Sequence, residues 1–169
     1  MSEEWVDWVN EANEVIAAVP RSQMRREHLR HRASYIVILD EAERIYVQRR
    51  TQTKDYCPGM LDACCGGVVQ AGEAYLPSAY RELEEEMGIR GVTLTEHGTH
   101  LLGDESCPVW GGLYSCHYQG PLQLQAEEVE YVLTMTPAQI LARAEEFTPD
   151  SLQALQIWLR LTDVTGVPA

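Results

Sequence analysis

The sequence feature that most constrains the fold is a nearly uninterrupted apolar run, Ala33–Leu39, which ends at Asp40. A strand that is apolar on both faces must be covered on both faces, because either face would otherwise contact water. The following segment, residues 44–50, alternates Ile45 and Val47 with polar neighbours after a short polar link. We therefore predict a strand over 33–39 that pairs with a strand over 44–50 as a hairpin.

The remaining periodicity predicts interleaved helices and strands. Apolar residues recur at helical spacing over 76–87, and Gly88 is expected to end that helix. Further strands are predicted at 92–102, 108–118 and 130–135, and further helices at 137–147 and 151–161, with Thr136 and Asp150 as their N-caps. No repeat or linker divides the chain, so we expect one domain over 1–169, an α/β fold with a mixed sheet and helices on its faces.

Charge excludes several classes of function. With 13 basic and 26 acidic residues the net charge is −13, which argues against binding to nucleic acid polymers or anionic membranes. No apolar stretch is long enough to span a membrane, and no secretory pattern is visible. Five cysteines without a Cys-x-x-Cys motif favour reduced thiols and a cytoplasmic location. Residues 21–54 nevertheless hold nine of the basic residues against four acidic ones. We interpret this segment as partly an anion-receiving edge.

Three carboxylates share one face of the helix predicted over 76–87. Glu82, Glu85 and Glu86 are spaced i, i+3 and i+4, so their side chains project together and repel one another. A divalent cation turns that repulsion into a binding site, and carboxylate oxygens suit Mg²⁺ or Mn²⁺, which commonly hold substrate phosphates as further ligands. An acidic face can also be merely solvated. The glycines of Gly66-Gly67 and Gly72 upstream favour the site, because they allow the backbone to turn tightly and approach a ligand closely.

Together these residues form a recognisable pattern over 67–89. It consists of Gly67, Glu73, Arg81-Glu82-Leu83, Glu85-Glu86 and Gly88-Ile89. This pattern resembles the complete signature of the Nudix hydrolases. The resemblance implies a Nudix-type α/β/α sandwich with a mixed β-sheet, in which the signature forms a loop, a helix and a loop. It also implies Mg²⁺- or Mn²⁺-dependent hydrolysis of a diphosphate linked to another moiety.

The resemblance also implies roles for individual residues. Metal ligands would be Glu82, Glu85 and Glu86, joined by the backbone carbonyl of Gly66. Glu73 and Arg81 would pair and hold the loop against the helix, so they, with Gly67 and Gly88, would be structural. The base that deprotonates the attacking water would come from the signature, at Glu85 or Glu86, or from a glutamate outside it, for which the candidates are Glu105 and the Glu127-Glu128 pair.

A narrower similarity introduces a second candidate activity. The matching segments are His31-Arg32-Ala33, Arg49-Arg50 with Lys54, Pro58-Gly59, Cys65-Gly66 and Glu105 with Cys107-Pro108-Val109. They resemble isopentenyl-diphosphate isomerase of the same superfamily, and over 14–163 the pattern is most similar to the YfcD-type group of bacterial Nudix proteins. By position, Cys65 and Glu105 fall where the isomerase has its catalytic pair. Arg50 and Lys54 fall where it binds diphosphate.

Departures from the isomerase pattern favour hydrolysis. His31 matches one metal-binding histidine of the isomerase, but Met24 and Gly67 stand where it has others, and Gly103 stands where it has an acidic ligand. We therefore predict a Nudix-type diphosphohydrolase that acts on a small-molecule diphosphate, and the family resemblance favours a homodimer. Two alternatives stay open: isomerisation through Cys65 and Glu105, and a non-catalytic nucleotide-binding module. Cys65 could also be a residue that only packs in the core.

Overall fold

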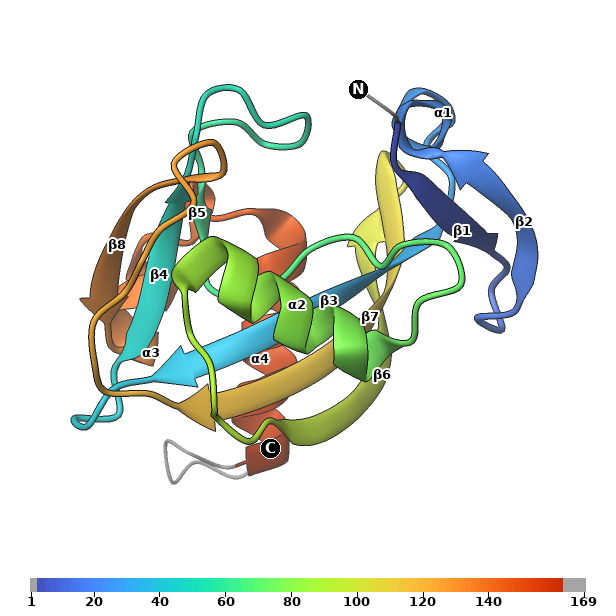
Figure 1. Cartoon of the computed structure of the whole chain (residues 1–169). Coiled ribbons are helices and arrows are strands. Elements are labelled where there is room, and N and C mark those ends of the chain that lie inside the picture. Colours follow the sequence, from blue (N-terminus) through green and yellow to red (C-terminus); the bar gives the residue numbers. More distant parts are fainter. Residues whose placement is uncertain (1–2, 163–169) are drawn as a thin grey trace.

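A mixed six-stranded sheet forms the centre of the molecule in the computed structural model, which describes residues 3–162 (Figure 1). The strands run in the order β5–β4–β3–β7–β6, and β8 pairs with β4. Their bounds are β3 (His31–Leu39), β4 (Ile45–Arg50), β5 (Leu61–Asp62), β6 (Thr95–Asp104), β7 (Cys107–His117) and β8 (Val129–Met135). The helices are α1 (Arg21–Glu27), α2 (Tyr75–Met87), α3 (Pro137–Ala142) and α4 (Pro149–Thr162).

Strand β3 lies in the interior, with helices on both of its faces, as its apolar sequence predicts. It pairs with β7 in parallel along its whole length, from His31↔Val109 to Leu39↔His117. Tyr35, Val37 and Leu39 pack in one core cluster with residues of α4, whereas Ile36 and Ile38 pack in another with residues of α2. The predicted α/β/α sandwich with a mixed sheet is therefore confirmed, with α2 in front of the sheet and α4 behind it in Figure 1.

The predicted hairpin of β3 and β4 is only partly correct. The two strands are antiparallel neighbours, but they pair at a single position, Leu39↔Ile45, after which β4 diverges and pairs with β5 and β8. Residues 65–68 take the edge of β3 that β4 leaves free, through the bridges Ile36↔Cys65 and Ala33↔Val68. The glycine loop that precedes α2 is thereby inserted into the sheet beside its central strand.

Two helix boundaries differ from the prediction. Helix α3 has the expected N-cap, Thr136, in a capping box with Gln139, but it ends at Ala142, and a short 3₁₀ helix at 144–146 follows. Helix α4 begins at Pro149, so Asp150 lies inside its first turn and not at the N-cap. Helix α2 ends as expected at Gly88, which adopts a left-handed conformation with φ 70°.

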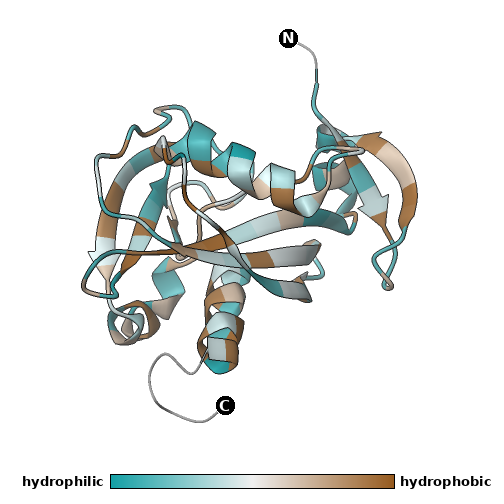
Figure 2. Cartoon of the chain, turned by 60° about the horizontal axis from the view of Figure 1, so that its bottom comes forward, coloured by the Kyte–Doolittle hydropathy of each residue, from teal (hydrophilic) through white to brown (hydrophobic). Residues whose placement is uncertain are grey.

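A two-stranded hairpin of β1 (Trp5–Val9) and β2 (Val15–Pro20) lies beside the sandwich and leads into α1. Val6, Val19 and Met24 pack with Val68 in a third, smaller core cluster, which joins the hairpin to the glycine loop. Helices α2 and α4 contain both hydrophobic and hydrophilic residues (Figure 2), as expected for amphipathic helices on the faces of a sheet. Within residues 3–162, none of the helices combines the length and hydrophobicity needed to cross a bilayer.

Candidate active site

The glycine loop is held to β3 by backbone hydrogen bonds on both sides of Gly66. The N–H groups of Ser34 and Ile36 donate to the carbonyls of Gly67 and Cys65, at 2.9 and 2.7 Å. By strand alternation the carbonyl of Gly66 points away from β3. A Cβ on Gly66 would lie 2.0 Å from the Ser34 carbonyl oxygen, at a φ of +149°, so only glycine fits there.

Arg81 connects the loop to the acidic face of α2. Its guanidinium donates to both oxygens of Glu73, at 2.9 and 3.0 Å, which is the ion pair expected from the signature. It also contacts Glu82 at 3.0 Å and Glu85 at 3.2 Å. Gly67 lies directly against Glu82, because a Cβ on Gly67 would lie 2.9 Å from that carboxylate. Two of the three predicted metal ligands are thus turned toward one arginine.

The third predicted ligand, Glu86, is buried. Its Oε1 accepts from Gln48 Nε2 at 3.3 Å and from the Cys65 thiol at 3.7 Å, so its direct hydrogen-bond donors are neutral. Burial and the nearby charge of Glu82 raise the pKa of Glu86 to about 8. Burial also raises the pKa of Glu82. The site therefore holds one buried carboxylate, Glu86, whose direct hydrogen bonds do not compensate its charge.

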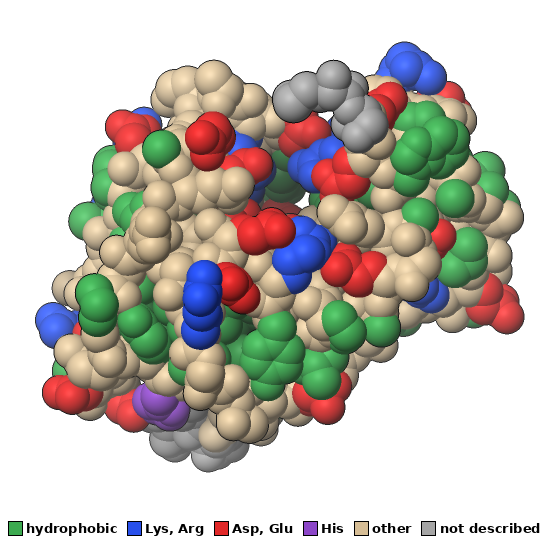
Figure 3. Space-filling view, in the orientation of Figure 1, with side chains coloured by type: hydrophobic (Ala, Val, Ile, Leu, Met, Phe, Trp, Pro, Cys, Tyr) green, Lys and Arg blue, Asp and Glu red, His purple; other side chains and the backbone are tan. Residues whose placement is uncertain are grey.

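A cavity opens beside the glycine loop, between α1 and the loop that joins β4 to β5 (Figure 3). Its walls include Gly66 and Gly67 together with both predicted diphosphate contacts, Arg50 and Lys54. Arg21 and Arg25 of α1 also line it, although Asp55 pairs with both. The basic segment 21–54 therefore contributes four cations to this cavity, and its other arginines lie elsewhere.

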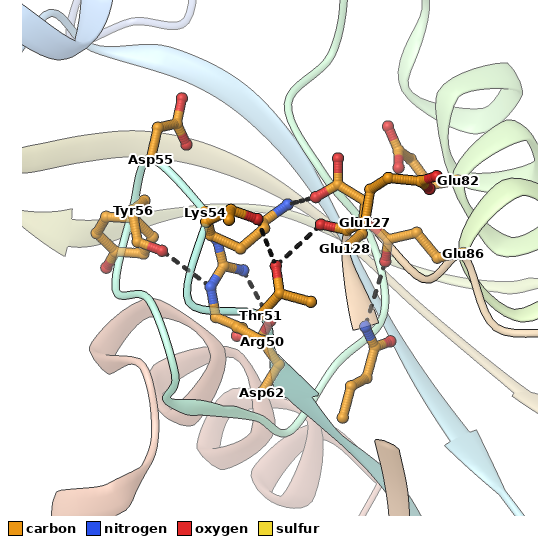
Figure 4. A network of polar contacts seen from close by, with 12 residues as sticks. Arg50, Thr51, Lys54, Asp55, Tyr56, Asp62, Glu82, Glu86, Glu127 and Glu128 are labelled. Carbon is orange, nitrogen blue, oxygen red and sulfur yellow. Dashed lines mark hydrogen bonds and ion pairs between the residues drawn. The ribbon is translucent and has the colours of Figure 1, made fainter. Parts of the chain in front are cut away.

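Arg50 is anchored by a buried network that sequence reasoning missed. Its Nη1 donates to Asp62 at 2.8 Å and its Nε donates to the carbonyl of Tyr56 at 2.9 Å (Figure 4). Asp150, which we predicted only as a helix cap, instead accepts from the hydroxyls of Tyr35 at 2.6 Å and Tyr56 at 3.0 Å. These partners are far apart in sequence, and no local motif marks them. The one available signal was that Asp62 follows an apolar residue within a short strand.

Lys54 lines the cavity and is paired there with a carboxylate. Its ammonium contacts Oε2 of Glu128, and in the view of Figure 4 Glu82 and Glu86 lie on the same side of the lysine as Glu128. The Glu127-Glu128 pair, considered from the sequence as a second source of a base, is thus brought to the α2 face. It arrives there because β8, which follows it, pairs with β4, which precedes Lys54.

Glu105 is not brought together with these residues. It lies in the turn between β6 and β7 and is exposed, and it is not among the described residues that line the cavity. The turn is shaped by its neighbour Asp104, whose carboxylate accepts the backbone N–H groups of Ser106 and Cys107. Cys65, its partner in the isomerase pattern, is buried in the core cluster between the sheet and α2, and burial raises the pKa of its thiol.

The donor set fits a hard divalent cation. Among residues 3–162, no three carboxylate, imidazole or thiolate groups already converge as a metal cluster. However, Glu82, Glu85 and Glu86 supply carboxylate oxygens from one helix, and Glu82 lies against Gly67, next to the outward carbonyl of Gly66. This donor chemistry suits Mg²⁺ or Mn²⁺. The uncompensated burial of Glu86 is the observation that favours a cation, because a positive ion would stabilise its charged form.

Comparisons with known proteins agree with this geometry. A NUDIX domain model matches residues 29–166. The chain is 58% identical over 159 residues to the Nudix hydrolase YfcD of Escherichia coli K12, covering 94% of this chain and 88% of that protein. A crystal structure of DR0079 from Deinococcus radiodurans superposes with a TM-score of 0.76 at 22% identity, over 91% of this chain and 97% of that one. The NUDIX domain of Shewanella oneidensis NrtR, in complex with ADP ribose, has a TM-score of 0.61 at 16% identity, over 75% and 84%.

Proposed function

The chain belongs to the Nudix hydrolases, which act on pyrophosphate bonds, and from that membership we propose that it is a Mg²⁺- or Mn²⁺-dependent hydrolase of a small organic diphosphate. A nucleoside diphosphate linked to another group is the substrate class that we favour. The likeness to a domain that binds ADP ribose is in keeping with such a compound. We further propose that the enzyme acts in the cytoplasm, where its five free thiols stay reduced, and that it forms a homodimer.

The observation that carries the proposal is the convergence of unlike charges at one cavity. Helix α2 presents Glu82 and Glu86 beside Gly67 of the cavity wall, whereas Arg50 at the end of β4 and Lys54 in the following loop line the cavity itself. A diphosphate with its metal ion carries both signs of charge and is complementary to this arrangement. A binding site for a simple anion would not need the carboxylates, and a site for metal alone would not need the cations.

In the proposed mechanism, Glu82, Glu85 and Glu86 would hold the metal together with the Gly66 carbonyl. When bound, the metal supplies Lewis acidity and lowers the pKa of a coordinated water. Arg50, fixed by Asp62 and Tyr56, orients the phosphate groups, and Lys54 adds a second positive contact. Arg81 and Glu73 hold the glycine loop against helix α2. Glu86 or Glu85 accepts the proton of the attacking water.

The two alternatives from the sequence are less well supported. The isomerase reading needs Cys65 and Glu105 to act on one substrate, whereas Cys65 is buried and Glu105 lies exposed in the β6–β7 turn. A non-catalytic module would not need the full set of signature carboxylates, all of which are present. The relatives that we compared are named Nudix hydrolases.

The test is release of phosphate-containing products from a panel of nucleoside diphosphate derivatives, with Mg²⁺ or Mn²⁺ present. We expect Glu86→Gln to lower kcat at least a hundredfold, about the cost of losing a group that stabilises the transition state. Glu84→Gln is the matched control, because Glu84 lies on the same helix but is exposed and pairs with Arg90. Equal activity of the two variants would refute the metal assignment.

A further inference from the structure

Arg25 of helix α1 lines the cavity but has no part in the mechanism proposed above. Its side chain is only 19% exposed, and it shares the cavity wall with Arg50. The next residue, Arg26, has a side chain that is 67% exposed, pairs with Glu27 and is not among the described residues that line the cavity. Of these two adjacent arginines on one helix, only Arg25 reaches the cavity.

The guanidinium of Arg25 is poorly supplied with hydrogen-bond acceptors. Its Nη1 donates to the Cys107 thiol at 3.5 Å, and a thiol sulfur is a weak acceptor. Its Nε is buried and has no hydrogen-bond partner among residues 3–162. Asp55 lies 3.5 Å from this Nε, but both oxygens of that carboxylate accept from Arg21, at 3.0 and 3.2 Å. Because donors without acceptors are unfavourable away from water, an acceptor that enters the cavity would stabilise Arg25.

Tyr56 places Arg25 beside Arg50. The Cζ atoms of the two arginines lie 5.2 and 5.6 Å from the centroid of this one ring, so the ring makes a cation–π contact with each. The ring is itself fixed, because the Tyr56 hydroxyl donates to the buried carboxylate of Asp150 at 3.0 Å. Arg50 already has an ion pair with Asp62 at 2.8 Å. The cavity wall therefore holds two neighbouring guanidinium groups, and the group on α1 is the one that is short of acceptors.

We propose that Arg25 is a further substrate-binding residue, which donates hydrogen bonds to anionic oxygens of the substrate beside Arg50. This inference rests on the function proposed above, and it assigns a residue that lies outside the signature. An arginine binds phosphate and carboxylate oxygens through the same planar set of N–H donors, and such charge-assisted hydrogen bonds are strong. The oxygens belong either to the diphosphate or to an anion on the group attached to it, and two probes separate these sources.

The first probe is inorganic pyrophosphate, whose binding is measured by titration calorimetry. Ca²⁺, which has longer bonds and a more flexible coordination, replaces Mg²⁺ to keep hydrolysis slow, and product analysis confirms that the ligand is intact. If Arg25 binds the diphosphate, Arg25→Gln should weaken the binding at least about tenfold, because a charge-assisted hydrogen bond is lost. Arg26→Gln is the matched control, since it removes the same charge one residue along the helix, outside the cavity. Its affinity should stay close to that of the unaltered protein.

The second probe is a pair of nucleotide sugars, UDP-glucose and UDP-glucuronate, which differ by one carboxylate. If Arg25 binds an anion on the attached group, Arg25→Gln should weaken the binding of UDP-glucuronate alone by a similar factor. If it binds the diphosphate, both compounds should bind more weakly, as pyrophosphate does. Unchanged affinity of Arg25→Gln for all three ligands would overturn the proposal.

A last test uses the unaltered protein, so it does not depend on a variant that folds. Phenylglyoxal, which modifies arginine side chains, is applied with and without UDP-glucuronate at equal ionic strength, and mass spectrometry identifies the modified residues. The ligand should slow modification of Arg25 several-fold relative to Arg26 in the same molecule. Equal effects on the two residues would overturn the proposal, and so would a failure of Arg25 to react in either sample, because its guanidinium would then be out of reach from the cavity.

The outcomes separate this inference from the function on which it rests. Hydrolysis of a diphosphate without any response of Arg25 would leave the proposed function standing and remove the inference. The responses of Arg25 without hydrolysis would remove only the proposed function.

Discussion

Arg50 and Asp62 form a buried ion pair at the floor of the cavity, with Nη1 of the arginine 2.8 Å from Oδ2 of the carboxylate. The other oxygen of Asp62 accepts from the Thr148 hydroxyl at 2.6 Å, so the pair is tied to the start of α4. The cation that we expect to touch substrate is thus positioned by the helix on the opposite face of the sheet.

Asp62→Asn should destabilise the fold by about 3 kcal/mol, because it leaves a buried guanidinium without its counter-charge. The change is isosteric and can keep the bond to Thr148. Urea unfolding would show a lower midpoint with the same slope. Glu146→Gln, which breaks the exposed pair with Arg143, is the control and should leave the midpoint in place. Similar midpoints for the two variants would show that burial of the Arg50 pair does not matter.

Gly67→Ala should impair catalysis with little loss of stability. The new methyl group would lie 2.9 Å from the carboxylate of Glu82, which must then move out of its position. We expect kcat/KM to fall roughly tenfold to a hundredfold, as a displacement of about 1 Å can cause. Gly72→Asn is the control in the same loop, because Gly72 faces open space at a φ of +77° that asparagine tolerates. Full activity of Gly67→Ala would contradict the close placement of Glu82.

His31 should make stability depend on pH between about 4 and 6.5. Burial, and next the charge of Arg25, lower the pKa of His31 to about 4, whereas the unfolded chain titrates near 6.5. The unfolded state therefore binds more protons in this range, and the contribution of His31 to stability is lost as the pH falls from 6.5 toward 4.

His31→Asn tests this contribution, because the asparagine amide can replace Nδ1, which contacts the carbonyl of Leu29 at 3.0 Å. The free energy of unfolding of the variant should vary less steeply over this range, by up to about 3 kcal/mol in total. Glu86 acts in the opposite direction, since its raised pKa favours folding at low pH. The measured quantity is therefore the difference between the two proteins at each pH, and a constant difference would rule out the contribution of His31.

Glu105→Gln should keep full hydrolytic activity. The residue is exposed in the turn between β6 and β7, and the described residues of the cavity do not include it. The turn itself depends on Asp104, so the substitution should not disturb it. Steady-state kinetics with a diphosphate substrate would decide the matter. A loss of kcat comparable to that of Glu86→Gln would return Glu105 to the role that its sequence position suggested.

Local patterns predicted the elements whose causes are local. The apolar run of β3, the spacing of α2 with Gly88 at its end, and the N-cap at Thr136 were all predicted from the sequence, since each depends on residues close together in the chain. The signature also indicated the Glu73–Arg81 contact, which spans only the loop and the first turns of the helix. These predictions concern neighbours in sequence.

Features set by distant pairing were not readable. Strand β4 diverges from β3 because it pairs with β5 and β8 instead, and the periodicity of a sequence does not show which strands pair. Asp150 had the right residue type for a cap, but the hydroxyls of Tyr35 and Tyr56 bind it more than ninety residues away in the chain. Lys54 was expected at phosphate, and only the pairing of β4 with β8 brings Glu128 to it.

The hydrogen bonds that join residues 65–67 to β3 have a further consequence for amide exchange. Because Ile36 and Cys65 bond to each other in both directions, the glycine loop can separate from β3 only when the sheet itself opens. The amides at this junction should therefore exchange as slowly as the centre of the sheet, whereas those of the loop at 51–60 should exchange sooner. Exchange should therefore distinguish the glycine side of the cavity, which is built into the sheet, from the loop that carries Lys54.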